Sequence, residues 1–187
     1  MVAFDATVLC RALLNPNGLE FELLLRAAQG MPFRGFTTEV VGVEFVRNAY
    51  TGFGAGDRFR TYGEDELEAF LNTFAPLFDL DNIHGSPLGR ALTSNHALHD
   101  RPLGEVLYEL TGQSDETLLA DLESQPTVTP GGSLRHFDPF DLHLALVAVR
   151  DGADVLCTSN TTDYSMANIG RVRIATPVAL ADDYGLR

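Results

Sequence analysis

Lysine is absent from this sequence: all 13 basic residues among its 187 are arginine. A Walker A phosphate-binding loop, the phosphate-anchoring lysine of a kinase and a Schiff-base nucleophile each require a lysine side chain. The sequence therefore excludes three large classes of enzyme.

Cysteine and long apolar runs are also scarce. The two cysteines, Cys10 and Cys157, stand in apolar segments, which is typical of reduced thiols in a cytoplasmic protein. No segment approaches the roughly 18 apolar residues of a membrane-spanning helix. The opening residues, MVAFDATVL, lack the basic start of a signal peptide and include Asp5 in their apolar run. We therefore expect a cytoplasmic protein with no membrane segment.

Charge is unbalanced, because 26 acidic residues give a net charge of −13. Residues 1–60 hold six acids and six arginines, so the excess negative charge lies entirely after residue 60. An acidic surface keeps a protein soluble, and it also suits a basic partner or a site whose carboxylates bind divalent cations. Composition leaves these interpretations open.

Hydrophobic patterning predicts one α/β domain over residues 1–187. Short, continuously apolar segments at 2–9, 154–157 and 172–175 are typical of buried parallel strands. Helical spacing appears at 19–30, 38–49, 64–78 and 139–151, with further helical signals at 102–110 and 115–123. We expect a central parallel sheet with helices on both faces, and a helical insertion at about 60–125.

Acidic and amide side chains fall where such a sheet binds its ligands, at the carboxyl ends of the strands. Asp5 lies within or just after the first strand, and Asn160 and Asp163 follow the strand ADVLC. Asp141 lies in the first turn of the helix that leads into that strand, and Glu44 lies in the middle of helix 38–49.

Some of these acids also have a purely structural interpretation. An ionised aspartate in a strand is costly to bury unless it is paired or bound to a cation, which favours a functional Asp5. Glu44 shares a helical stripe with apolar residues, whereas Glu39 lies in the first turn, where an acid suits the helix dipole. We therefore prefer Glu44 as the site residue.

Asp141 is open to both interpretations. Asp138 is a good N-cap and Pro139 suits the first helical position, so Asp141 can simply stabilise the helix start. However, carboxylates that converge in one cleft repel each other by about 4 kcal/mol per pair at 4 Å and an effective dielectric constant of about 20. A hard divalent cation relieves this repulsion. Together, the acids predict phosphodiester hydrolysis that depends on Mg²⁺ or Mn²⁺.

The chain resembles the PIN-domain ribonucleases, and among them the VapC-like toxins of bacterial toxin–antitoxin pairs. The resemblance covers about residues 1–50 and 135–180, and rests on the segments FDATVL, VVGVEFVRNA, FDPFDLHLALVAVRDGADVLCTSN and TSNTTDY. It implies a three-layer α/β domain, metal-dependent endoribonuclease activity on RNA, a homodimer, and an antitoxin protein that covers the cleft.

The resemblance also implies roles for individual residues. Asp5 and Asp141 would bind Mg²⁺ directly, and Glu44 would bind it through water or orient the attacking water. The fourth position is Asn160 or Asp163. Thr158, together with Asn160, would hold the ligand loop.

Few basic residues are available to bind RNA. Arg47, Arg58 and Arg60 form the nearest cluster that could contact a phosphate backbone, and solvated surface groups explain them equally well.

Two other functions compete with the nuclease. A dehalogenase-type phosphatase needs a second aspartate two residues after the first, where this chain has Thr7, and a lysine that it lacks. A catalytically silent PIN module that binds protein or RNA is the alternative we retain, although unused clustered carboxylates are costly.

Overall fold

The computed structural model describes residues 1–78, 139–160, 164 and 167–187. Five strands form one sheet in the order β2-β1-β3-β5-β4. They are β1 (Val2–Phe4), β2 (Gly35–Phe36), β3 (Val155–Cys157), β4 (Asn168–Ile169) and β5 (Val172–Ala175). Every pairing is parallel except that of β4 with β5. The prediction of an α/β fold with a central parallel sheet is therefore confirmed except at the edge, where β4 is antiparallel.

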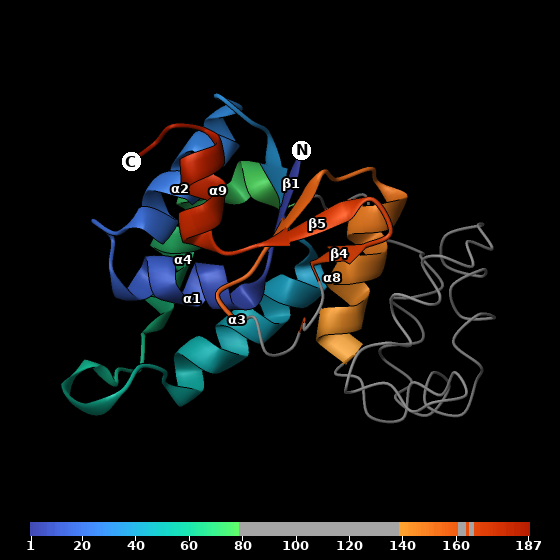
Figure 1. Ribbon diagram of the computed structural model, residues 1–187. Coiled ribbons are helices and arrows are strands. Elements are labelled where there is room, and N and C mark those ends of the chain that lie inside the picture. The colour runs from blue at the N-terminus through green and yellow to red at the C-terminus, as the bar shows by residue number, and fades with distance from the viewer. Residues whose placement is uncertain (79–138, 161–163, 165–166) are drawn as a thin grey trace.

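Six α-helices are found in the described residues: α1 (Ala6–Leu14), α2 (Leu19–Gln29), α3 (Glu39–Thr51), α4 (Glu64–Thr73), α8 (Pro139–Arg150) and α9 (Pro177–Asp183). Helices α1, α2 and α9 lie on one side of the sheet, and α8 lies on the other (Figure 1). Helix α3 contacts both α1 and α8 and passes along the edge at which β1 ends (Figure 1). This arrangement is compatible with a three-layer α/β domain. Within the described ranges, no helix has the length and apolar content that a membrane crossing requires.

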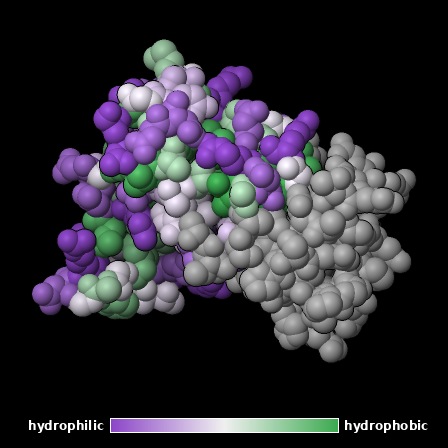
Figure 2. Space-filling model, viewed as in Figure 1, coloured by the Kyte–Doolittle hydropathy of each residue, from purple (hydrophilic) through white to green (hydrophobic). Residues whose placement is uncertain are grey.

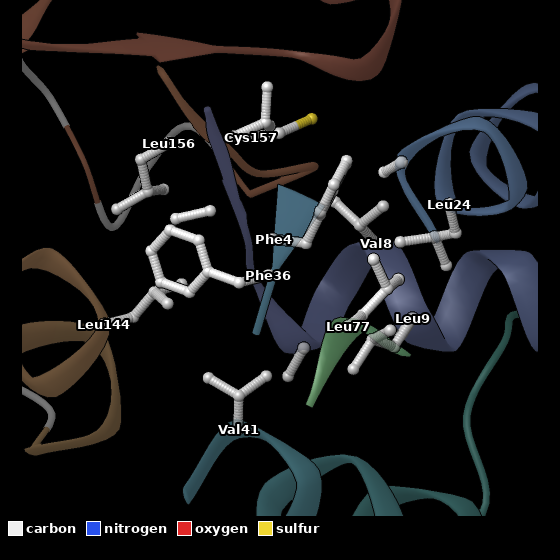
Figure 3. Close-up of a cluster of buried hydrophobic side chains, with 14 of the residues drawn as sticks. Phe4, Val8, Leu9, Leu24, Phe36, Val41, Leu77, Leu144, Leu156 and Cys157 are labelled. Atoms are coloured by element: carbon white, nitrogen blue, oxygen red, sulfur yellow. The ribbon is translucent and has the colours of Figure 1, made fainter. Parts of the chain in front are cut away.

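The hydrophobic core lies on both faces of β1 and β3, all of whose residues are buried. Phe4 packs among helices α1 and α2, and Leu144 of α8 lies near Leu156 and Phe36 (Figure 3). Full burial of such side chains contributes about 1.5–3 kcal/mol each. The continuously apolar strands are thus explained by helices that cover both faces of the sheet.

The sequence predicts one strand over the apolar run at residues 2–9, and this prediction is wrong. The run is divided between a strand and a helix. Strand β1 ends at Phe4, and α1 begins at Ala6 because the Asp5 carboxylate accepts a hydrogen bond from the Ala6 N–H at 2.8 Å. Asp5 is the N-cap of this helix. Val8 and Leu9, expected in the strand, are buried on α1 instead.

Other predicted helices differ from the structure mainly at their ends. Helix α4 stops at Thr73, and a 3-10 turn, η2 (Ala75–Leu77), follows because Pro76 cannot continue an α-helix. Strand β4 and helix α9 were not predicted, and β4 is only two residues long. The predicted helices at 102–110 and 115–123, and the part of the predicted insertion beyond residue 78, lie outside the described residues.

Candidate functional site

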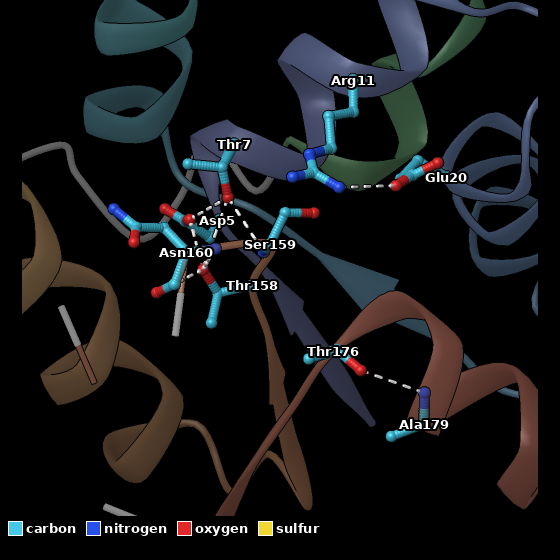
Figure 4. A network of polar contacts seen from close by, with 9 residues as sticks. All are labelled: Asp5, Thr7, Arg11, Glu20, Thr158, Ser159, Asn160, Thr176 and Ala179. Carbon is cyan, nitrogen blue, oxygen red and sulfur yellow. Dashed lines mark hydrogen bonds and ion pairs between the residues drawn. The ribbon is translucent and has the colours of Figure 1, made fainter. Parts of the chain in front are cut away.

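The candidate site lies where the direction of the chain connections reverses. From β1 the chain leads to β2 on one side, and from β3 it leads through the edge strand β4 to β5 on the other. Open α/β sheets bind ligands at such a switch point, beyond the carboxyl ends of the strands. Asp5 directly follows β1 and Thr158 directly follows β3, so the two side chains meet there (Figure 4).

The Asp5 carboxylate is buried and accepts three hydrogen bonds. Its Oδ1 accepts the Ala6 N–H at 2.8 Å, and its Oδ2 accepts the hydroxyls of Thr7 at 2.5 Å and Thr158 at 2.8 Å. Only 4% of Asp5 is exposed, and no basic side chain in the described part of the chain forms an ion pair with it. Because each carboxylate oxygen has two lone pairs, Oδ2 is saturated and Oδ1 keeps one acceptor position.

The two hydroxyls connect this carboxylate to the loop after β3. The Thr7 hydroxyl oxygen accepts the Ser159 N–H, and the Thr158 hydroxyl oxygen accepts the Asn160 N–H, each at 3.0 Å (Figure 4). Each hydroxyl therefore donates its single proton to Asp5 and accepts a backbone N–H. These bonds use the Thr158 side chain and the Asn160 backbone, and the role expected of both residues in holding a ligand loop stays a prediction.

Thr7 has a comparable place in the network, and sequence reasoning missed it. It was used only to argue against a phosphatase. The signal was its position in the first turn of a helix capped by Asp5, where a hydroxyl two residues on lies within reach of the capping carboxylate.

Glu44 lies half-buried on α3, on the side that approaches α1. Its nearness to Cys10 of α1 is shown by the pKa of that thiol, which is raised to about 12, first by burial and then by the negative charges of Glu44 and Asp5. A hydrogen bond with Asn48 acts in the opposite direction. Both candidate carboxylates therefore act on the same thiol between α1 and α3.

Asp141 is half-buried in the first turn of α8. Since α8 precedes β3 and packs on it, its first turn lies toward the carboxyl end of that strand. The Tyr164 hydroxyl donates to the Asp141 carbonyl oxygen at 2.9 Å, which ties the segment after β3 to the start of α8. Asn160 is also half-buried. Asp163 lies outside the described residues, so the choice between it and Asn160 stays open.

The donors at this edge are oxygen atoms, which are the ligands that Mg²⁺ and Mn²⁺ prefer. Among the described residues, no three side chains of His, Cys, Asp or Glu are grouped as ligands for one metal ion. Mg²⁺ is commonly held by only one or two carboxylates and keeps several waters. The one remaining acceptor position on Asp5 Oδ1 therefore fits one contact to such a cation.

Arg47, the predicted RNA contact, is exposed on α3 and lies about one helical turn, some 5 Å along the axis, beyond Glu44. Arg58 and Arg60 lie farther away, in the segment between α3 and α4. The three arginines therefore lie progressively farther along the chain from Glu44, the first on α3 and the other two after it.

The chain matches no family model, no curated protein and no solved structure. Fold and site geometry alone define its class: an α/β protein with a mostly parallel five-stranded sheet and a buried aspartate at the switch point.

Proposed function

We propose that this protein is a Mg²⁺- or Mn²⁺-dependent endoribonuclease of the PIN type. The observation that carries the proposal is Asp5, a buried carboxylate at the switch point with no basic partner among the described residues. Burial of an ionised carboxylate costs several kcal/mol, and a bound cation offsets that cost. A divalent cation would activate water and neutralise the charge that develops on the phosphodiester.

Each site residue has a distinct task in this proposal. Asp5 and Asp141 would hold the cation, and Glu44 would orient the attacking water. Asn160 or Asp163 would complete the acidic edge. Thr158 keeps the Asp5 carboxylate and the loop after β3 in place through the hydrogen bonds described above. Arg47, exposed on α3, would contact the RNA backbone.

The biological setting that we propose is the toxin of a type II toxin–antitoxin pair, acting in the cytoplasm as a homodimer. The antitoxin would be a protein that covers the carboxyl edge of the sheet. Support for this setting comes from the VapC-like segments of the sequence, FDATVL and the block that begins at FDPFDLHLAL.

A silent PIN-type module that binds protein or RNA is the second candidate. One observation favours it: three donors already satisfy the Asp5 carboxylate, so the network is stable without a cation. In that case the hydroxyl network would serve the fold alone.

RNA cleavage by purified protein tests the proposal. Wild type is compared in Mn²⁺ and in EDTA with Asp5→Asn and Asp141→Asn, and with Asp65→Asn as an exposed acidic control on α4. We expect Mn²⁺-dependent cleavage that falls by at least about a hundredfold in the first two variants, because each removes a direct ligand. Asp65→Asn should cleave like wild type.

Two results would contradict this account. Cleavage by Asp5→Asn at the wild-type rate would show that the assignment of Asp5 to the catalytic site is wrong. No cleavage by the wild-type protein in either condition would favour the silent module.

A further inference from the structure

The segment between α3 and α4, residues 52–62, forms a small hairpin that we call the arch. Its two arms pair through Phe53 and Arg60, whose backbone N–H and carbonyl groups exchange hydrogen bonds at 3.1 and 3.2 Å. Gly54 has φ of 108°, and a Cβ there would lie 2.3 Å from the Arg58 carbonyl oxygen. Only glycine fits this position, which indicates that the arch has one defined backbone conformation. The arch projects from the body of the molecule (Figure 1).

Phe59 presents an aromatic ring to solvent on this arch. Its Cζ atom would lie 2.5 Å from a Cβ at Gly52, so the end of the ring rests directly on the glycine. The remainder faces outward, and 58% of the residue is exposed. A supported ring with a free surface is the geometry on which nucleic-acid bases stack.

Two arginines flank that ring in the sequence. Arg58 is exposed, and its guanidinium forms no ion pair within the described residues. The Arg60 guanidinium lies 4.7 Å from the centre of the Tyr62 ring and forms an ion pair with Glu66. Both arginines line a hollow of about 410 Å³ together with Leu14, Asn15 and Asp57.

We propose that the arch binds single-stranded RNA, with a base stacked on Phe59 and a backbone phosphate near Arg58 and Arg60. This inference rests on the proposed nuclease function and supplies a substrate contact that is remote from the carboxylates. Asp57 and Glu66 offset part of the positive charge, so stacking carries much of the affinity and binding is modest.

The surface favours RNA over a protein partner. A protein-docking patch is a continuous apolar area rimmed by polar groups. In the sequence of the arch a single exposed phenylalanine lies between two arginines, and Figure 2 shows hydrophilic and moderately hydrophobic residues beside each other at the lower left, where the arch lies. Alternation of aromatic and basic groups is typical of single-strand binding.

Fluorescence anisotropy with a labelled oligouridylate of about ten nucleotides tests the inference, in EDTA so that no cleavage occurs. We expect Phe59→Ala to weaken binding roughly 5- to 100-fold, and Phe59→Trp to retain it because a stacking face remains. Arg58→Ala should reduce the slope of log affinity against log salt concentration by about 0.7. Val178→Ala on α9 and Arg187→Ala are the exposed controls and should bind like wild type.

The outcomes separate this inference from the nuclease proposal. If RNA binding depends on Phe59 but the protein never cleaves RNA, the inference about the arch is supported and the nuclease proposal is rejected. If Phe59→Ala and Arg58→Ala both bind and cleave RNA like wild type, the inference about the arch is overturned and the nuclease proposal is unaffected. Absence of oligouridylate binding by wild type overturns the inference. Self-association that Phe59→Ala abolishes, without an effect on RNA, also overturns it and assigns the surface to a second copy of the chain.

Discussion

At the scale of single residues, Asp5 combines two tasks. Its Oδ1 caps α1 by accepting the Ala6 N–H, and its Oδ2 takes the hydroxyl protons of Thr7 and Thr158. The sequence suggested a functional Asp5 from the cost of burying a carboxylate, and this cost is met in part by the hydroxyls. Those hydroxyls could not be predicted as a pair, because Thr158 lies 153 residues from Asp5.

Removal of the Thr158 hydroxyl tests the network as a structural unit. Thr158→Val leaves the Asn160 N–H without its acceptor and Asp5 with one donor fewer, at a buried position. We expect the free energy of unfolding to fall by about 1–3 kcal/mol, measured by urea denaturation.

Two matched threonine variants accompany that measurement. Thr158→Ser keeps the hydroxyl and should retain most of the stability. Thr51→Val at the exposed end of α3 should change stability by no more than about 0.5 kcal/mol. Equal stability of Thr158→Val and wild type would show that the network contributes nothing to the fold.

At the scale of elements, the sequence predicted types better than boundaries. The apolar strands β3 and β5 and the helices α2, α3 and α8 follow from their hydrophobic patterns. Helix α1 did not, because its Val8 and Leu9 are β-branched or apolar residues that continue the pattern of β1. Only the N-cap at Asp5 separates β1 from α1. Whether this one aspartate continues the strand or caps a helix depends on the hydrogen bond of its side chain, which a hydrophobic pattern does not reveal.

Close approach between elements is the second feature that patterns do not reveal. Gly35 of β2 packs so tightly that a Cβ would lie 2.6 Å from both the Ala27 Cβ of α2 and a ring carbon of Phe4. We expect Gly35→Ala to lower the free energy of unfolding by about 1–3 kcal/mol through overpacking, measured by thermal or urea denaturation.

Gly63→Ala is the matched control for that variant. No atom lies within 4 Å of a Cβ at Gly63, and its φ of −84° suits any residue. Gly63→Ala should lower the free energy of unfolding by a smaller amount, under about 1 kcal/mol, as expected for a change at an N-cap. Equal effects of the two substitutions would contradict tight packing of β2 against α2.

At the scale of the whole molecule, the topology turns distant segments into one site. Residues 5–7 and 158–160 meet because β1 and β3 are neighbours in the sheet, and α8 carries Asp141 toward the same edge. Sequence reasoning reached this edge through the rule that ligands bind at strand ends, without knowing the strand order. The convergence of three or four carboxylates stays a prediction, because Asp163 lies outside the described residues.

Charge is also organised at this scale. The excess negative charge lies after residue 60, whereas the stretch that includes α1, α3 and most of the arch is balanced. A negatively charged substrate would therefore meet less repulsion from residues 1–60 than from the remainder of the chain. This distribution is compatible with the RNA contact proposed for the arch, where residues 52–62 hold two arginines and one aspartate.

The central claim is that the sheet edge at Asp5 binds a divalent cation, and thermal denaturation with and without Mn²⁺ tests it most directly. Saturating Mn²⁺, at about 100 times its dissociation constant, should stabilise the wild type by about 2.7 kcal/mol, which raises Tm by several degrees at this chain length. Asp5→Asn should lose this shift, and Asp65→Asn should keep it. A wild-type Tm unchanged by Mn²⁺, or an equal shift in Asp5→Asn, would contradict the account.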